Sequence, residues 1–340
     1  MKSIPKMKIS ASIYSDKKRP LKEVIDDLVE HQIEVLHVDC NDDIAVFDDI
    51  RNIRKWCQTP IDLHIITENP EKYFDLLIEN PVEYITFQYE NLKDPLQIPE
   101  RITGKKGLAI TTPTDVRVFS DFEYMDFILI MATIPGQSGG SFDRINFSKI
   151  RKFRSTYPRK SIHVDGGVNA EVSFILRNMG VSLSVSGSYL FSGASIGNSL
   201  MNLTQREIDS TYCVGDFMTP LEETPHTHIE NATTKSILEC VENGNMGFAL
   251  ICNNQNELFG LTSSADIRKA LLNKIENASS IGPDDLINKK PISISEKATV
   301  MELLQKIKSC AFPIMYLPVV DQSNNAVGIV NFVHLIKGEI

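Results

Sequence analysis

The chain has 340 residues, of which 42% are apolar and 23% charged, an ordinary globular composition. At about 150 residues per domain, this length predicts roughly two domains. The net charge of −9 provides no basic surface for a polyanion, so we expect no nucleic-acid partner. The sequence contains no apolar run of the roughly 20 residues that a membrane span needs, and Met1–Ile9 lacks the apolar segment of a secretory signal.

The cysteines are scattered along the chain without a C-x-x-C spacing. They are Cys40, Cys57, Cys213, Cys240, Cys252 and Cys310. This distribution is typical of a reduced, cytoplasmic protein whose thiols are small buried side chains rather than metal ligands or nucleophiles. We therefore expect a cytoplasmic protein without disulfides or a membrane segment.

Short β-branched runs alternate with amphipathic segments over the first two hundred residues. The predicted strands are Lys8–Ile13, Val35–Asp39, Ile61–Ile66, Tyr84–Phe87, Gly107–Ile110, Phe127–Met131, Ser161–Asp165 and Leu183–Ser186. Helical spacing of apolar residues appears at Leu21–His31, Ile150–Ser155 and Val172–Met179. Eight strands alternating with helices predict a (β/α)₈ TIM barrel over residues 1–205. An open doubly wound sheet is the competitor, but its glycine-rich turn is missing after the first strand, which runs into Ser15–Lys18.

The remainder of the chain contains an internal duplication with a period of about 65 residues. The predicted elements are Thr234–Glu242, Gly247–Cys252, Leu258–Leu261 and Ala265–Asn273, then Val300–Lys308, Met315–Val320, Ala326–Val330 and a terminal helix. Each half is βαββα-like, and one such unit cannot cover both faces of its sheet, so we expect the halves to pack together. We expect a polar linker around Thr204–Thr211 and then two halves, at about 212–275 and 280–340, within 212–340.

Pairs of His and Asp two residues apart lie at the ends of three predicted strands. They are His37 with Asp39, Asp62 with His64, and His163 with Asp165. Residues two apart in a strand share a face, and the active site of a (β/α)₈ barrel is built at these strand ends. A hydrogen-bonded polar layer is the alternative for any one pair, but three pairs at one mouth favour a site. Two imidazoles with two carboxylates suit Zn²⁺, Mn²⁺ or Fe²⁺ better than Ca²⁺ or Mg²⁺.

Glycine-rich turns follow the last three predicted strands of the barrel. They are Pro135–Gly140, Gly166-Gly167 and Gly187-Ser188. Glycine lets backbone N–H groups approach an anion closely, and phosphate sites in this fold favour the loops after strands seven and eight. Together with the His and Asp pairs, these turns indicate a phosphate beside a metal.

These motifs resemble the ribulose-phosphate 3-epimerase family over residues 7 to about 192. The resemblance is carried in unbroken order by Lys8–Ile13, Leu36–Asp39, Asp62–His64, Met131–Phe142, Val164–Asn169 and Ser186–Ser188. It implies an isomerase that epimerises a ketose phosphate at C3 with one divalent metal per barrel. The metal ligands that it implies are His37, Asp39, His64 and Asp165.

The same resemblance implies roles in catalysis and substrate binding. Asp39 and Asp165 would be the acid/base pair, because two carboxylates on opposite sides of a carbon can remove and return a proton. The substrate contacts that it implies are Ser12, His64, Gly139, Gly140, Gly166, Gly167, Gly187 and Ser188.

The chain departs from the family pattern at three places. Gln88 stands where the family usually has His, Cys40–Ile44 replaces a methionine-containing loop, and Gln137-Ser138 replaces Phe-Gly. The implied ligands are kept while the rim differs, so we expect an altered sugar phosphate. The alternatives are a barrel that has lost turnover and acts as a ligand-binding regulatory protein, and a decarboxylase. The intact ligand set disfavours the first, and the absence of an Asp-x-Lys-x-x-Asp run disfavours the second.

Residues 212–340 resemble a tandem pair of CBS domains. The resemblance is carried by Met218-Thr219-Pro220 and by Gly260–Asp266. It implies that the Ser263 hydroxyl contacts the phosphate and Asp266 the ribose of an adenine nucleotide. The alternative is a structural dimerisation module in which Asp266 only caps a helix, and we expect a homo-oligomer.

The second copy of the CBS signature differs from the first. It has Asn331 and His334 where the hydroxyl and the carboxylate belong, so we expect one nucleotide per chain rather than two. His226 and His228 have a metal-like spacing but no further ligand nearby in the sequence, and we expect them to be solvated loop residues.

Overall fold

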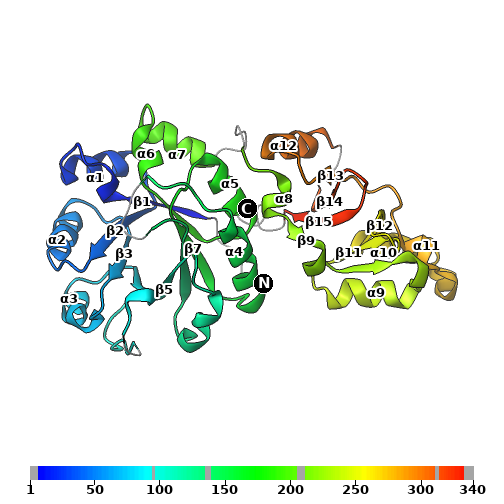
Figure 1. The fold of residues 1–340 in the computed structure, drawn as a ribbon, viewed down its shortest axis with the longest axis horizontal. Helices are drawn as coiled ribbons and strands as arrows, with labels where there is room; N and C mark the ends of the chain where they lie inside the picture. Colours follow the sequence, from blue (N-terminus) through cyan, green and yellow to red (C-terminus); the bar gives the residue numbers. More distant parts are fainter. Residues whose placement is uncertain (1–6, 94–95, 135–138, 205–210, 311–313, 333–340) are drawn as a thin grey trace. The chain divides into compact units, whose positions relative to one another are not determined.

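The computed structural model describes residues 7–93, 96–134, 139–204, 211–310 and 314–332 (Figure 1). The described residues up to Thr204 form one compact unit, and those from Thr211 onward form a second. The predicted boundaries at 205 and 212 adjoin residues 205–210, which lie outside the described residues, so these boundaries stay a prediction.

The first unit is a closed barrel of eight parallel strands in the order β1 to β8. The strands are β1 Lys8–Ser12, β2 Val35–Asn41, β3 Ile61–Ile66, β4 Tyr84–Gln88, β5 Lys105–Thr111, β6 Phe127–Met131, β7 Ser161–Asp165 and β8 Leu183–Ser186. β8 closes the barrel by pairing with β1, where Ile9 lies opposite Ser184. The predicted TIM barrel is therefore confirmed.

Helices cover the outside of the barrel. They are α1 Leu21–Glu30, α2 Val46–Trp56, α3 Phe74–Glu79, α4 Ile145–Thr156, α5 Ala170–Asn178, α6 Ser188–Ser192 and α7 Ile196–Thr204. The expected alternation with α-helices is wrong for the described residues after β4 and β5, where the 3₁₀ segments η3 (Tyr89–Asn91) and η4 (Val116–Phe122) stand instead. Pro99 and Pro113 lie in these connections, and proline lacks the N–H that a helix interior requires.

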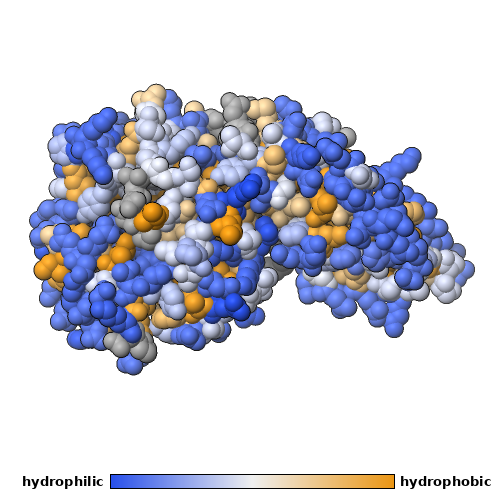
Figure 2. Space-filling view, viewed as in Figure 1, coloured by the Kyte–Doolittle hydropathy of each residue, from blue (hydrophilic) through white to orange (hydrophobic). Residues whose placement is uncertain are grey.

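The covering helices bury one face each. In α1 this face is Val24, Ile25 and Leu28, the spacing of an amphipathic helix. Inside the barrel, apolar side chains gather on β5, β6 and β8, with Val35 of β2 beside them. These are Ala109, Phe127, Leu129 and Met131 in one cluster and Val35, Leu183 and Val185 in another. Figure 2 shows mainly hydrophilic residues on the face in view, as expected when the apolar side chains fill a core.

The second unit contains two sheets, in the orders β10-β11-β12 and β13-β14-β15-β9. Its strands are β9 Thr219–Pro220, β10 His226–His228, β11 Phe248–Cys252, β12 Leu258–Ser263, β13 Ile294–Ser295, β14 Tyr316–Val320 and β15 Ala326–Asn331. Its helices are α8 Val214–Phe217, α9 Thr234–Asn243, α10 Ser264–Asn273, α11 Pro283–Leu286 and α12 Val300–Ser309. Shorter 3₁₀ segments are η5 Leu221–Glu223, η6 Ile229–Asn231 and η7 Ile275–Ser280.

The two halves of this unit are joined by reciprocal contacts. Leu258 N donates to Asn324 O at 2.9 Å, and Ala326 N donates to Asn256 O at 2.8 Å. Both asparagines have a φ of 64°, so equivalent turns face each other. Phe248 and Leu261 of the first half share a core with Ala326 and Ile329 of the second. The duplication and the packing of its halves are therefore confirmed, whereas the predicted terminal helix falls within 333–340, outside the described residues.

The Met-Thr-Pro signal has a structural role that the sequence did not reveal. Thr219 and Pro220 form β9, which pairs antiparallel with β15 of the second half. The first half thus completes the sheet of the second, which ties the two copies together.

We expect the N-cap of α5 to stabilise the connection after β7. Asn169 Oδ1 accepts a hydrogen bond from Val172 N at 2.9 Å, directly after the Gly166-Gly167 turn. Asn169→Ala should lower the free energy of unfolding of the barrel by about 1 kcal/mol, the usual value for a lost cap. Chemical denaturation followed by circular dichroism measures this change. Asn169→Asp keeps an acceptor and is the matched control, and an equal loss in both variants would contradict the capping role.

Candidate active site

Four side chains meet at the carboxyl ends of the barrel strands. They are His37 and Asp39 from β2, His64 from β3 and Asp165 from β7, with one ligand atom of each lying within 4.8 Å of the others. Both imidazoles are fully buried, whereas each carboxylate keeps 18% of its side-chain surface exposed. The carboxylates are therefore the groups that a molecule entering the barrel mouth reaches.

The strand register explains why these side chains converge. His37 lies opposite Asp62, and Asp39 lies opposite His64, in the pairing of β2 with β3. Alternate residues of each strand point into the barrel, so all four side chains turn inward at successive levels. His37 Nε2 lies 3.2 Å from Asp39 Oδ1 and 3.8 Å from Asp165 Oδ2.

Each imidazole is oriented by an acceptor on its far side. His37 Nδ1 donates to Asp62 Oδ2 at 2.8 Å, and His64 Nε2 donates to Gln88 Oε1 at 2.8 Å. The opposite nitrogens, His37 Nε2 and His64 Nδ1, therefore face the carboxylates. This is the arrangement of metal-binding histidines, whose second nitrogen is held by an outer hydrogen bond.

The surroundings of the two carboxylates shift their pKa values in opposite directions. Burial alone would raise the pKa of Asp39, but the charge of His37 and its hydrogen bond hold that pKa well below its usual range. Burial raises the pKa of Asp165 to about 6, with the charge of Asp39 adding to the shift and the imidazoles opposing it. Burial would lower the pKa of His37, but Asp39 and Asp62 outweigh it and raise that pKa well above its ordinary value.

The donor set fits a divalent transition-metal ion. Two imidazole nitrogens and two carboxylate oxygens within 4.8 Å match the ligands preferred by Zn²⁺, Mn²⁺ and Fe²⁺. His64 Nδ1 is buried and has no hydrogen-bond partner among the described residues. A buried polar atom of this kind is costly unless something binds it.

The glycine-rich turns lie close to one another at the same end of the barrel. A Cβ at Gly140 or at Gly166 would come within 2.6 Å of Thr133, so both turns pack against this residue. Gly166 and Gly167 have φ values of +109° and +66°, and a Cβ on Gly167 would lie 2.1 Å from Phe142 N. Both positions therefore require glycine.

Three further predicted substrate contacts, Ser12, Gly187 and Ser188, lie on β1 and directly after β8. Ser12 is level with His37 in the pairing of β1 with β2. A Cβ at Gly187 would lie 3.4 Å from Ser12 Cβ, and Ser188 is the first residue of α6. Gly139 has a φ of +91° with open space around it. The predicted residues Pro135 to Ser138 lie outside the described part of the chain.

Two predicted positions have roles other than those expected. Gln88 is 1% exposed and contacts His64, so it lies behind a candidate ligand and not on the substrate-facing rim. His163 faces inward but stacks on Phe127 at 4.0 Å, and burial lowers its pKa to about 4, so it is a neutral core residue. The sequence predicts that Asp62 faces into the barrel but assigns it no function. The period-two pattern places Asp62 on the same face as His64, and Gln88 on the same face as Thr86, which lies opposite His64; this signal could have identified both.

The rim loop after Asp39 is fixed by its own contacts. The carboxylate of Asp42 accepts hydrogen bonds from the hydroxyls of Thr67 and Tyr73 and pairs with Lys72 at 2.6 Å. Asp42 adopts a φ of 57°, a left-handed conformation that aspartate tolerates. The loop therefore has a defined conformation, and it places Ile44 in solvent at 59% exposure.

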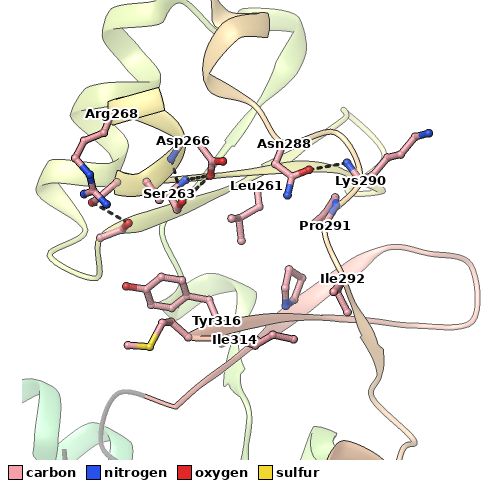
Figure 3. A pocket seen from close by; sticks show the side chains of 15 residues that line it. Leu261, Ser263, Asp266, Arg268, Asn288, Lys290, Pro291, Ile292, Ile314 and Tyr316 are labelled. Atoms are coloured by element: carbon pink, nitrogen blue, oxygen red, sulfur yellow. Dashed lines mark hydrogen bonds between the residues drawn. The ribbon is translucent and has the colours of Figure 1, made fainter. Parts of the chain in front are cut away.

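A cavity of about 530 Å³ lies between the halves of the C-terminal unit (Figure 3). Ser263, Asp266 and Lys290 line one side, and Ile314 and Tyr316 line the opposite side. Ser263 and Asp266 also form the capping box at the start of α10, with Asp266 Oδ2 accepting from Ser263 N at 2.9 Å. Asn331 lies in β15, opposite Tyr316, and His334 lies outside the described residues.

Other expectations concern residues away from these sites. All six cysteines are free, but only Cys40 and Cys252 are buried, so the expectation of buried side chains is wrong for Cys57, Cys213, Cys240 and Cys310, which are partly exposed. Within the described ranges, no helix has the length and apolar character to cross a bilayer. The expectation that His226 and His228 are solvated loop residues is wrong, because both lie in β10, are partly buried and donate from Nδ1 to backbone carbonyls at 2.9 Å. A cytoplasmic location and a homo-oligomer stay predictions.

The barrel and its site agree with a match to a known family. The model of the ribulose-phosphate 3-epimerase family matches residues 8–191, more than half of the chain. The chain belongs to the ribulose-phosphate 3-epimerase family. The predicted family is therefore confirmed. The CBS domain model matches residues 284–338 of the same chain.

Curated relatives carry the name ribulose-phosphate 3-epimerase. The protein of Eremothecium gossypii is 31% identical over 138 residues, 39% of this chain and 57% of the relative. The proteins of Methanocaldococcus jannaschii and Bacillus subtilis are 29% and 25% identical, and the matches cover 60% and 54% of this chain and 92% of each relative. This family member therefore spans little more than half of the first of these relatives and nearly all of the other two.

The C-terminal unit of this epimerase-family chain is similar to solved CBS-pair structures. One is the Arabidopsis thaliana protein CBSX2, with 20% identity, a TM-score of 0.31, and coverage of 38% of this chain and 94% of that one. Another is a CBS domain pair solved in complex with 5-methylthioadenosine and S-adenosyl-L-methionine, with 22% identity, a TM-score of 0.31, and coverage of 37% and 97%. The predicted order of a TIM barrel followed by a CBS pair is confirmed by the topology and the domain match.

Proposed function

We propose that the barrel catalyses the metal-dependent epimerisation of a ketose phosphate at C3. The observation that carries this proposal is the convergence of His37, Asp39, His64 and Asp165 at the barrel mouth, next to the glycine-rich turns. Membership of the epimerase family agrees with it. A barrel that had lost turnover would have no reason to keep buried, oriented imidazoles beside two carboxylates.

The donor atoms of this cluster would hold one divalent ion, Zn²⁺, Mn²⁺ or Fe²⁺. His37 Nε2 and His64 Nδ1 would bind it together with one oxygen each from Asp39 and Asp165. When bound, the ion stabilises the negative charge that develops on the ketone oxygen as the neighbouring proton leaves.

Asp39 and Asp165 would perform the proton transfers. The carboxylates come from β2 and β7, on either side of the β1–β8 pair, and both are exposed to the barrel mouth. One carboxylate removes the C3 proton, and the other carboxyl returns a proton to the opposite face, which inverts that carbon. Ser12, on β1 between these two strands, lies where its hydroxyl can bind a hydroxyl of the substrate.

The glycine-rich turns would hold the phosphate. Gly139 and Gly140 follow β6, Gly166 and Gly167 follow β7, and Gly187 and Ser188 follow β8, so the three loops leave neighbouring strands at the same end of the barrel. Glycine permits the close approach that an anion needs. Holding the phosphate fixes the distance from C3 to the two carboxylates, which lowers the entropic cost of the reaction.

We propose that the substrate differs from the usual pentulose phosphate. Residues Cys40–Ile44 replace the methionine-containing segment of the family. The contacts of Asp42 with Thr67 and Lys72 fix the conformation of this loop. A change in rim groups alters which substrate hydroxyls find partners, and sites with buried polar groups discriminate by up to about 10⁴-fold or more.

We expect purified protein to contain about one divalent metal ion per chain and to exchange the C3 proton of a ketose phosphate with solvent deuterium. Elemental analysis and NMR of pentulose, hexulose and heptulose phosphates in D₂O measure both. His64→Ala should lose the metal and the exchange while keeping its circular dichroism spectrum. Full exchange in metal-free His64→Ala protein would contradict the metal mechanism, and the highest kcat/KM on D-ribulose 5-phosphate would contradict the altered substrate.

We expect Asp39→Asn and Asp165→Asn each to abolish epimerisation, because each carboxylate serves one face of the carbon. Proton exchange without inversion should persist at a low rate in one variant, from the face that the remaining carboxylate serves. Deuterium incorporation and product configuration are measured separately, at a metal content matched to the wild type. Normal turnover in both variants would show that the two-carboxylate assignment is wrong.

We propose that the C-terminal cavity binds one adenine nucleotide per chain. Its volume of about 530 Å³ is that of a small-molecule site. The side of Ser263, Asp266 and Lys290 offers polar groups to ribose and phosphate, and the apolar surfaces of Leu261, Ile292 and Tyr316 suit a base (Figure 3). The second copy lacks the Ser and Asp pair, having Asn331 and His334 in the sequence.

We expect an adenine nucleotide to raise the melting temperature of the wild type, since a ligand at a hundredfold excess over Kd adds about 2.7 kcal/mol. Asp266→Ala should abolish this shift by removing the acceptor for the ribose hydroxyls. Glu302→Ala removes the acid of another capping box, at Thr299 and away from the cavity, and should keep the shift. A thermal-shift screen of AMP, ADP, ATP and S-adenosylmethionine measures this. An equal shift in Asp266→Ala would place the ligand elsewhere.

A further inference from the structure

The side chain of Gln88 links His64 to a carboxylate outside the metal cluster. Its Oε1 accepts from His64 Nε2 at 2.8 Å, and its Nε2 donates to Glu90 Oε2. We propose that Gln88 is a positioning residue that, with Glu90, fixes the tautomer of His64 so that Nδ1 faces the metal. This inference rests on the metal site proposed above.

Glu90 is held firmly by the end of β5. Its Oε1 accepts from Thr111 N at 2.8 Å, from Thr111 Oγ1 at 2.7 Å and from the hydroxyl of Thr114. Burial would raise the pKa of Glu90, but these hydrogen bonds and the one from Gln88 lower it below its usual value. Glu90 is therefore an ionised carboxylate at neutral pH, and an ionised carboxylate can only accept hydrogen bonds.

The charge of Glu90 determines the orientation of the amide. Only the NH₂ end of Gln88 can face Glu90, so the carbonyl end faces His64. A carbonyl can only accept, so His64 must carry its proton on Nε2. The Nδ1 of a neutral imidazole in this tautomer has a free lone pair. That nitrogen is buried, has no hydrogen-bond partner in the described parts of the chain and lies 3.5 Å from Asp39 Oδ1.

The two imidazoles are thus oriented by different means. His37 contacts the carboxylate of Asp62 directly, whereas His64 contacts a neutral amide with the carboxylate one step further away. Another carboxylate in contact with the cluster would add negative charge beside Asp39, Asp62 and Asp165. The amide of Gln88 orients His64 as the Glu90 carboxylate requires, while the negative charge of Glu90 stays one side chain away from the candidate ligands.

The chemistry of the link predicts which residues can replace Gln88. A side chain at this position must accept from His64 and donate to Glu90. A neutral histidine has one donor and one acceptor nitrogen and meets both requirements, whereas methionine has a similar length and meets neither. Gln88→His should therefore keep the tautomer of His64, and Gln88→Met should lose it.

The first test measures metal affinity directly. Metal-free full-length protein is titrated with Zn²⁺ in competition with a chelator. Gln88→Met should bind about 10- to 100-fold more weakly, the usual effect of removing an outer partner of a metal ligand, and Gln88→His should restore affinity close to that of the wild type. Thr86→Val is the matched control: Thr86 lies on the same strand, opposite His64 in the sheet, and its hydroxyl has no partner among the residues described.

The second test determines the tautomer itself. In ¹⁵N-histidine NMR of the metal-free protein, His64 should carry its proton on Nε2 in the wild type and in Gln88→His, and should show a mixture of tautomers in Gln88→Met. His64→Ala identifies the signal. Unchanged affinity and tautomer in Gln88→Met, or an equal loss of affinity in Thr86→Val, would overturn the inference. A wild type that shows the Nε2 proton but binds no metal would overturn the metal site and leave the positioning of His64 intact.

Discussion

The imidazole of His37 is the group on which the rest of the barrel site depends. It contacts Asp62 on one side and Asp39 on the other, and it lies 3.8 Å from Asp165, so it links β2 to β3 and to β7. It is fully buried, and its hydrogen bond to Asp62 determines which nitrogen faces the two exposed carboxylates. Burial acts to raise the pKa of both Asp39 and Asp165, and the charge and hydrogen bond of this ring hold the pKa of Asp39 low in spite of it.

The interior of the barrel is divided by polarity. On β1 to β4 it contains Ser10, Asp62, Thr86 and three of the four candidate ligands, the fourth being Asp165 on β7, whereas on β5, β6 and β8 it is filled by the apolar clusters around Leu129 and Val185. Interiors of this fold are usually apolar throughout. Several polar atoms on the β1 to β4 side, among them Asp62 Oδ1 and Ser10 Oγ, have no partner in the described residues, which costs free energy of folding. Such a cost is typical of a functional site.

The sequence predicted the barrel and the convergence of His and Asp side chains at its mouth because both follow from period-two alternation. His37, Asp39, His64 and Asp165 lie at strand ends, where register brings them together without knowledge of loop conformation. The sequence could not show that β9 pairs with β15, since Thr219 and Pro220 form too short a strand to leave a pattern. It also did not show that Asp42 adopts a positive φ, because the contacts of that residue with Thr67 and Lys72 come from a distant segment.

Two of the departures from the family pattern lie in different surroundings, one exposed at the barrel mouth and one buried behind a histidine. Cys40–Ile44 lies at the mouth, with Ile44 in solvent, so changes there affect what enters the barrel. Gln88 is buried behind His64 and touches nothing that enters, so a change there affects how a ligand nitrogen is presented. Gln88 is therefore not on the substrate-facing rim of this chain. A side chain at this position must accept a hydrogen bond from the imidazole of His64 and donate one to the ionised carboxylate of Glu90, and both Gln and His can do so.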